Sequence, residues 1–248
     1  MTEHTVRSFD EQLKQLKHLI VQMGGLAEAE LDNAITALTR RDTALAQSTV
    51  GSDSRLDELE HEIADLAVRI LALRQPMASD LREIVGALKI SSDLERMGDY
   101  AANVAKRAIA LSQLPAVKPA GSIPRMARLV QAIIKDVLDA YVERDAERAV
   151  DAWRRDEEVD EIYTSIFREL LTYMMEDARN ISACTHLLFV AKNIERIGDH
   201  ATNIAETIHY LVLGRQIDRA RPKGDTTSFA VVTPGDAARP KATDEAGG

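Results

Sequence analysis

Two segments of the chain carry the same chemical pattern. Residues 93–103 read DLERMGDYAAN and residues 193–203 read NIERIGDHATN, so Glu-Arg-x-Gly-Asp occurs twice, 100 residues apart, each time followed by Asn. On a helix, side chains at i, i+4 and i+8 lie in one column along a face. The sequence therefore predicts two polar columns, formed by Glu95, Asp99 and Asn103, and by Glu195, Asp199 and Asn203.

These columns are unfavourable for a helix on its own. Carboxylates at i, i+4 repel by a few tenths of a kcal/mol, and Gly98 and Gly198 each cost about 1 kcal/mol relative to Ala. A bound cation would offset the repulsion, and the glycine would admit a closely approaching group. Hard oxygen ligands favour magnesium, calcium, manganese or iron over a closed structural zinc site. We therefore interpret both columns as candidate metal sites.

Further ligands must come from neighbouring helices. Glu28 and Asp32 repeat the Glu-x-x-x-Asp spacing in the first predicted helix. At the matching place in the second half, Asp136 and Asp139 stand at i, i+3, so the match there is weaker. The amide carbonyls of Asn103 and Asn203 are candidate third ligands or supporting donors.

Two other interpretations stay open at this stage. Glu-x-x-x-Asp is common in an acidic chain, and most acidic stripes are solvated helix faces. The pairs Glu58-x-x-His61 and Glu206-x-x-His209 match a signature of ferritin-like di-iron bundles. They occupy non-equivalent helices of the two halves, which argues against a shared di-iron centre.

Helical periodicity runs through most of the chain and predicts an all-α fold. Apolar residues recur at three and four positions, and Pro and Gly are sparse before residue 214. The pattern predicts six helices in two tandem three-helix bundles related by pseudo-symmetry. The predicted organisation is a first unit at 1–113, a Pro-rich linker at 114–124, a second unit at 125–213, and a disordered tail at 214–248.

Composition excludes several classes of function. The net charge is −9, whereas a nucleic-acid-binding protein normally has a basic surface. Cys184 is the single cysteine, and no stretch has the length of a signal peptide core or a membrane span. We expect a cytoplasmic protein. Because no phosphate-binding loop or nucleophile motif is present, we do not expect an enzyme.

The chain resembles the PhoU family of phosphate-uptake regulators. The resemblance rests on ERMGD and ERIGD together with longer strings around them. These are MGGLAEAELDNAI at 23–35, RQPMASDLR at 74–82 and VDEIYTSIFRELLTYMMEDARNI at 159–181. The similarity covers residues 5 to 215, and the tail lies outside it.

The resemblance implies a negative regulator of the phosphate-starvation response, built as a homodimer of pseudo-symmetric chains. Such a protein links the ATPase subunit of the phosphate transporter to a sensor histidine kinase, and meets the membrane only through these partners. It implies divalent or trivalent metal ions (iron, manganese, magnesium or zinc) on the faces at Glu95–Asp99, Glu195–Asp199 and Glu28–Asp32. A metal-storage or metal-buffering protein is the alternative that the acidic columns leave open.

Overall fold

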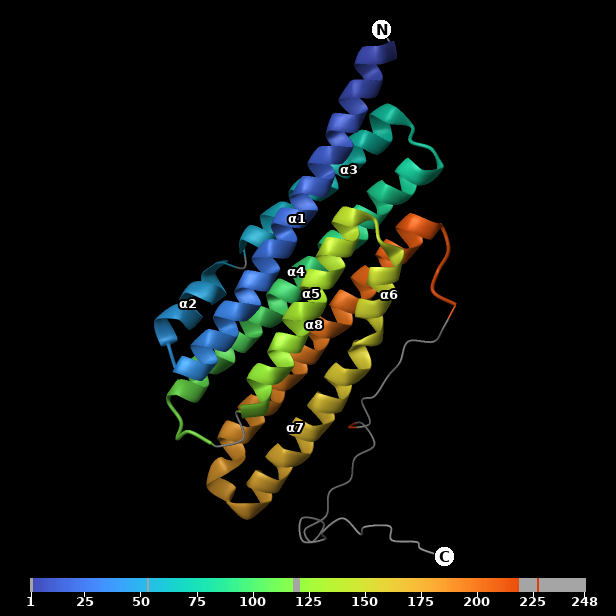
Figure 1. Ribbon diagram of the computed structural model, residues 1–248. Helices are drawn as coiled ribbons and strands as arrows, with labels where there is room; N and C mark the ends of the chain where they lie inside the picture. Colours follow the sequence, from blue (N-terminus) through green and yellow to red (C-terminus); the bar gives the residue numbers. More distant parts are fainter. Residues whose placement is uncertain (1, 53, 118–120, 219–226, 228–248) are drawn as a thin grey trace, which may run out of the picture.

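The computed structural model describes residues 2–52, 54–117, 121–218 and 227, and these contain helices and no strands (Figure 1). The predicted all-α class is confirmed. The first unit consists of α1 (Thr2–Arg40), α2 (Thr43–Ser52), α3 (Ser54–Arg74) and α4 (Ala78–Ser112). The second consists of α5 (Ser122–Glu143), α6 (Ala146–Arg154), α7 (Asp156–Glu176), the 3-10 turn η2 (Ala178–Asn180) and α8 (Ile181–Leu213).

The middle helix of each unit is built from two segments, α2 with α3 and α6 with α7. Acidic caps start both pairs. Asp42 accepts a hydrogen bond from the Leu45 amide (3.0 Å), and Asp145 accepts from the amides of Glu147 and Arg148 (2.9 and 3.0 Å). Such capping satisfies amides that lack an intrahelical partner. The sequence pattern predicted three helices in each unit, and the structure divides the middle one of each unit into two segments.

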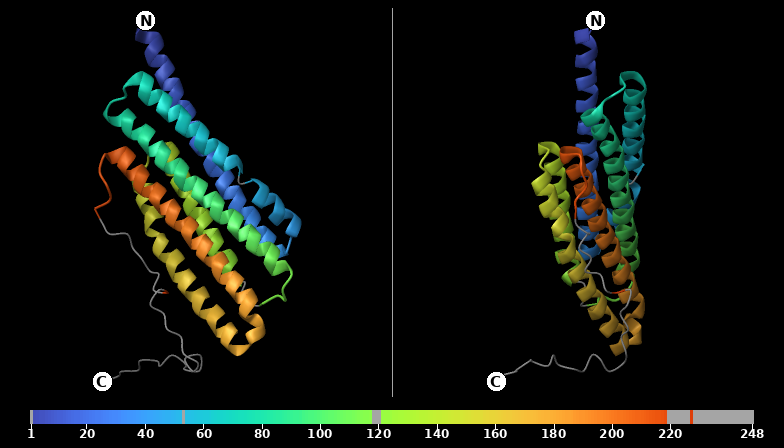
Figure 2. Two further views of the ribbon diagram at one scale, coloured as in Figure 1. Left: turned by 180° about the vertical axis from the view of Figure 1, so that it is seen from behind. Right: turned by 90° about the vertical axis from the view of Figure 1, so that its right-hand side faces the viewer.

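Two long helices form the centre of the molecule. α4 and α8 run antiparallel beside each other, and α1 of the first unit contacts α5 of the second (Figures 1 and 2). Buried apolar side chains of both units form one continuous cluster, which includes Leu94 and Met97 of α4 and Ile194 and Ile197 of α8. We call the contact between α4 and α8 the seam. Because the core crosses the seam, the two units share their hydrophobic stabilisation.

Close approach between the units depends on two glycines. A Cβ on Gly24 of α1 would lie 2.3 Å from Cδ2 of Leu138 in α5. A Cβ on Gly86 of α4 would lie 2.5 Å from Cδ2 of Leu211 in α8. Each leucine thus packs onto the glycine backbone of the opposite unit, where a larger residue would clash.

Helix ends follow local backbone chemistry. α3 ends at Arg74, two residues before Pro76, because proline disfavours the α region for the residue that precedes it. α8 ends at Leu213, where Gly214 takes a left-handed conformation (φ 69°) and its amide donates to the Tyr210 carbonyl. This is a usual way to satisfy a last-turn carbonyl.

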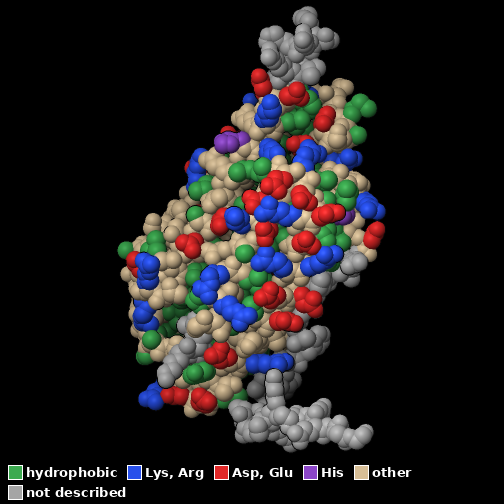
Figure 3. Space-filling view, in the orientation of Figure 1, with side chains coloured by type: hydrophobic (Ala, Val, Ile, Leu, Met, Phe, Trp, Pro, Cys, Tyr) green, Lys and Arg blue, Asp and Glu red, His purple; other side chains and the backbone are tan. Residues whose placement is uncertain are grey.

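None of the helices in the described ranges has both the length and the apolarity needed to cross a membrane. Across the face in Figure 3, acidic and basic side chains alternate rather than separating into patches. Most of the predicted tail at 214–248, and part of the linker at 114–124, lie outside the described residues.

Candidate metal-binding faces

In the second unit, the column on α8 faces acids of α7. Glu195 is buried, with 5% of its surface exposed, and Asp156 and Asp160 of α7 are buried as well. Oε1 of Glu195 accepts a hydrogen bond from Nζ of Lys192 (2.8 Å). Its Oε2 is buried and has no hydrogen-bond partner among the described residues. Asp199 completes this group of carboxylates at a half-buried position.

Burial and crowding change the protonation of Glu195. Desolvation raises the pKa of Glu195 from its ordinary value of 4.5 to about 7, against the hydrogen bond from Lys192, which lowers it. Asp199 and Asp160 raise the pKa further through their negative charge. Near neutral pH, the carboxyl group is thus poised between its two forms, and a cation beside it would favour the ionised form.

The first unit has the same column in a more open setting. Glu95 and Asp99 on α4 are half-buried, and Arg96 pairs with both, at 3.4 Å from Oε2 of Glu95 and 3.0 Å from Oδ2 of Asp99. Desolvation, and then the charge of Asp99, raise the pKa of Glu95 to about 6, while Arg96 lowers it. Glu60 and Asp57 of α3 also raise it.

The acids nearest to each α4 or α8 column therefore come from the middle helix of the unit. We expected them from the first helix, at Glu28 and Asp32. Instead, Asp32 is exposed and its Oδ1 accepts a hydrogen bond from Nε2 of Gln131 on α5 (3.1 Å). Glu28 is half-buried on α1 and is not among the groups that shift the pKa of Glu95. Their role as ligands stays a prediction.

The two acids of α5 are engaged by arginines of the second unit. Asp136 accepts hydrogen bonds from Arg148 (3.1 Å) and from Arg155 (2.7 Å). Asp139 also pairs with Arg148, which extends to Glu143 as well. This ion-pair network gives both carboxylates a structural partner, so a metal-binding role at these two positions stays a prediction without further support.

The asparagines continue the columns but belong partly to the seam. Nδ2 of Asn203 donates to Oδ1 of Asp93 across the seam (3.3 Å), and Nδ1 of His200 lies 2.7 Å from the same oxygen. Asn103 is half-buried at the corresponding place on α4. The amide of Asn203 therefore helps to hold the two units together.

The motif glycine of α8 is not a point of close helix contact. A Cβ on Gly198 would meet Val159 at 3.5 Å, Val130 at 3.6 Å and Oδ1 of Asp156 at 3.9 Å. These are ordinary van der Waals distances. Of the two reasons considered for the glycine, close helix approach fails at Gly198, and room for a bound ion stays a prediction.

The residues around Glu195 fit a hard cation in donor type and charge. They offer carboxylate oxygens, one of them buried without a hydrogen-bond donor in the part of the chain that the structure describes. In the described ranges, however, no three His, Cys, Asp or Glu side chains converge as a ready coordination shell. Lys192 now supplies the positive charge at Glu195, and Arg96 does so at Glu95. Binding of metal would require these cationic side chains to move.

Sequence reasoning missed the acids of α7. Asp156 and Asp160 have the same i, i+4 spacing as the motif acids, and Asp160 aligns with Asp57 at the offset of 103 that relates the middle helices. That spacing was a usable signal. Many other acids in the same helix obscured it, since only the tertiary packing shows which of them are buried.

The two Glu-x-x-His pairs do not form one centre. Nδ1 of His61 lies 2.7 Å from the Asp57 carbonyl oxygen in its own helix, and Nδ1 of His209 lies 3.0 Å from the Arg215 carbonyl oxygen. Glu206 accepts a hydrogen bond from the Trp153 indole (2.9 Å). Each pair thus has a separate local environment.

Fold and acidic faces together define a tandem helical-bundle protein with internal pseudo-symmetry. The model of the PhoU domain matches the chain twice, over residues 20–108 and 123–208. The chain belongs to the PhoU family.

Relatives and solved structures agree with this assignment. A phosphate-specific transport system accessory protein PhoU homolog of Caulobacter vibrioides is 57% identical over 92% of this chain and all of its own length. The Rhizobium meliloti homolog is 54% identical, over 91% of this chain and 95% of its own. The crystal structure of PhoU from Pseudomonas aeruginosa is 40% identical, with a TM-score of 0.81, over 84% of this chain and all of that one.

Proposed function

We propose that this protein is a negative regulator of phosphate uptake and of the phosphate-starvation response. The observation that carries the proposal is the 57% identity, over the full length of the relative, to a protein named as an accessory of a phosphate-specific transport system. A Streptococcus pneumoniae structure named as a phosphate transport system regulatory protein supports it, at 29% identity and a TM-score of 0.78 over 85% of this chain and all of that one.

The proposed mode of action is that of an adaptor rather than an enzyme. The protein would work in the cytoplasm as a homodimer, and would contact the ATPase subunit of the phosphate transporter and a sensor histidine kinase. The antiparallel pair of units supports this role, because it offers two similar but chemically different faces to two partners. When phosphate is ample, the adaptor would hold the kinase in its phosphatase-biased state.

Metal binding is proposed as part of this function. Glu195 and Asp199, with Asp156 and Asp160 from α7, would hold an ion in the second unit. Glu95 and Asp99 would do so in the first. A bound ion would supply the positive charge that fixes the ionised form of these carboxyl groups. The buried carboxylate oxygen of Glu195 supports the second unit as the stronger of the two sites.

Deletion of the gene tests the regulatory role. Transcripts of phosphate-uptake genes should rise in phosphate-rich medium, because the repressing adaptor is absent. The wild-type gene should restore repression when supplied in trans. Unchanged transcripts in the deletion strain would contradict the proposal.

The metal-storage alternative makes a different prediction for the same strain. Loss of a metal buffer should change cellular metal content and metal tolerance, with no change in phosphate-gene expression.

Complementation with Glu195→Ala/Asp199→Ala separates the two parts of the proposal, regulation and metal binding. A variant that still represses shows that regulation does not need metal in the second unit.

A further inference from the structure

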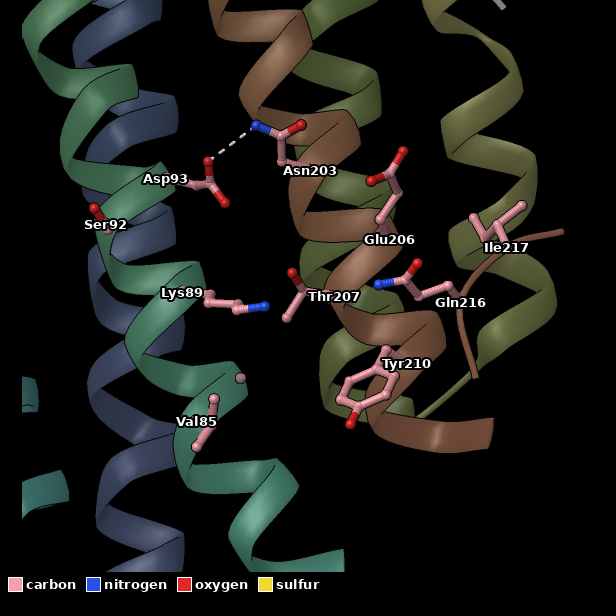
Figure 4. A pocket seen from close by; sticks show the side chains of 11 residues that line it. Val85, Lys89, Ser92, Asp93, Asn203, Glu206, Thr207, Tyr210, Gln216 and Ile217 are labelled. Atoms are coloured by element: carbon pink, nitrogen blue, oxygen red, sulfur yellow. Dashed lines mark hydrogen bonds between the residues drawn. The ribbon is translucent and has the colours of Figure 1, made fainter. Parts of the chain in front are cut away.

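A groove of about 820 Å³ opens along one end of the seam (Figure 4). Lys89 and Asp93 line it from α4, and Asn203, Glu206 and Thr207 line it from α8. In Figure 4, Lys89 points across the groove toward Thr207, and Asp93 points toward Asn203. Asn203 belongs both to the α8 column and to the groove, whereas the carboxylates proposed as metal ligands do not line the groove.

The opposite end of the seam shows how such a space is filled. There, the guanidinium of Arg107 lies 4.4 Å from the ring centre of Phe189 and its Nη1 lies 3.2 Å from Nδ1 of His186. A guanidinium stacked on an aromatic face is a favourable contact. We call this end, where the arginine side chain of α4 lies against α8, the closed end.

The offset of 100 residues that relates the two Glu-Arg-x-Gly-Asp motifs also relates the two ends of the seam. By this offset, Thr207 corresponds to Arg107, Lys89 to Phe189, and Gly86 to His186. At the groove end, a short side chain therefore replaces the arginine, and a glycine replaces the histidine. The groove end therefore has no counterpart of Arg107.

Charge at the two ends is also reversed. Lys106, next to Arg107, corresponds to Glu206 in the groove, and Asn193 corresponds to Asp93. Among the described residues that line the groove, two carry negative charge and Lys89 is the single cation. The closed end carries its own cations, whereas the open end has a surplus of carboxylate.

Both groove carboxylates are held in place by neighbouring side chains. Oδ1 of Asp93 is held by His200 and Asn203, at 2.7 and 3.3 Å. Oε1 of Glu206 is held by the Trp153 indole, at 2.9 Å. Because these acceptors are already held in place, they lose little conformational entropy when a charged donor binds. The arrangement is therefore suited to binding a cation.

We infer that the seam groove binds a basic peptide segment of a partner protein, with an arginine side chain entering at the place that Arg107 fills at the other end. The guanidinium would donate to Glu206 and Asp93, and its planar group would lie along Tyr210, which lines the groove and is partly exposed. Bidentate donors of this kind recognise carboxylates better than a lysine ammonium does. This inference does not depend on metal binding or on the phosphate role.

The test uses the full-length protein and two probe peptides, acetyl-GRGRG-amide and its glutamate counterpart acetyl-GEGEG-amide. Amide resonances are followed by NMR during titration. The arginine peptide should shift resonances of Lys89, Asn203 and Thr207, and the glutamate peptide should not. Equal shifts with both peptides, or shifts confined to other surfaces, would overturn the inference.

Two charge variants give opposite expected changes. Glu206→Gln should weaken arginine-peptide binding about tenfold, the scale of one charge-assisted hydrogen bond, while its side-chain carbonyl keeps the Trp153 bond. Lys89→Gln should strengthen binding several-fold, since it removes the competing cation. Glu147→Gln on α6 is the matched control, an exposed acid that should leave binding unchanged. Equal affinities in all three variants would overturn the inference.

Transplanting the closed end gives the sharpest variant. Lys89→Phe with Thr207→Arg introduces the Phe189–Arg107 pair into the groove and should abolish peptide binding without loss of helicity. A full-length variant with Arg219, Arg221 and Lys223 changed to Ala tests the chain's own basic segment as occupant. Tighter peptide binding by that variant would assign the groove to this segment and overturn a partner protein as the ligand.

Discussion

The two copies of Glu-Arg-x-Gly-Asp have nearly the same sequence but different electrostatic settings. The side chain of Glu95 is 16% exposed and pairs with Arg96, which is itself 56% exposed. The side chain of Glu195 is 6% exposed and pairs with Lys192, at 34%. The pKa rises to about 6 for Glu95 and to about 7 for Glu195.

The difference shows that the motif sets the position of the carboxylates, while the neighbouring helix sets their properties. α7 places buried Asp156 and Asp160 in the second unit. In the first unit, α3 contributes exposed Asp57 and half-buried Glu60. Desolvation is the largest cause of the pKa rise in both units, so we expect the second unit to respond more strongly to every change at its motif.

The largest expected effect is on metal content. Glu195→Ala/Asp199→Ala should lower metal affinity in the second unit by at least about tenfold, as loss of direct ligands should exceed the loss seen for supporting groups. The fold should survive because the variant removes two mutually repelling charges. Elemental analysis of the purified protein and circular dichroism measure both results.

The matched variant is Glu95→Ala/Asp99→Ala. If the second unit binds metal more tightly than the first, this variant should lose only the more weakly bound metal of the first unit. Equal metal content in both variants and in the wild type would contradict the assignment of these residues as ligands. Equal losses in the two variants would contradict the difference between the units.

The next effect is on the pH dependence of stability in metal-free protein. Because the pKa of Glu195 is raised in the folded state, the folded protein binds more protons than the unfolded chain between pH 4.5 and about 7. Stability from this group is therefore present at low pH and lost as pH rises through about 7. At pH 8, Glu195→Gln should be more stable than wild type by roughly 1–2 kcal/mol.

Urea unfolding at pH 4 and pH 8 measures this change in the free energy of unfolding. At pH 4, wild type and Glu195→Gln should have nearly the same stability. Glu95→Gln should show a smaller gain over the narrower window from 4.5 to about 6, because Glu95 is less buried. A larger gain for Glu95→Gln would reverse the comparison.

A smaller effect is expected at the motif glycine. Gly198→Ala should stabilise the metal-free protein by about 1 kcal/mol, since alanine favours the helix and its Cβ meets neighbours at 3.5 Å or more. Gly86→Ala is the control, and should gain none of this stability because its Cβ would lie 2.5 Å from Leu211. Thermal unfolding compares the two. Destabilisation by Gly198→Ala would show that tight packing does require this glycine.

The smallest effect is expected at the exposed ion pair of the first unit. Arg96→Ala should change the free energy of unfolding by less than about 1 kcal/mol, as exposed pairs contribute little. Lys192→Gln should instead raise the pKa of Glu195 further, because it removes the hydrogen bond that lowers this pKa. NMR titration of the glutamate carboxyl carbons measures the second change. A fall in the pKa of Glu195 would contradict the proposed role of Lys192.

Local chemistry made much of the fold predictable. The caps at Asp42 and Asp145, the stop before Pro76 and the end of α8 near Gly214 all follow from short-range backbone requirements. The break between α6 and α7 was not predictable in this way, because no Pro or Gly marks residues 150–160.

The site was predictable only in part. Repetition identified the α4 and α8 columns, since equal spacing in both units is visible in the sequence. The acids that face them, such as Asp160, depend on which side of α7 packs inward. Asp32 shows the same limit, because its contact with Gln131 joins helices about 100 residues apart in the chain.

The shared core has a consequence during synthesis. The seam face of α4 carries small and polar residues such as Gly86 and Asp93, which contact Leu211 and His200 of α8. Its partner α8 is complete only at Leu213, about 100 residues after α4 ends. At usual ribosome speeds, the first unit therefore waits about 5–20 s with this face uncovered. The modest apolar area of such residues keeps that nascent surface less prone to aggregation than a leucine-rich one would be.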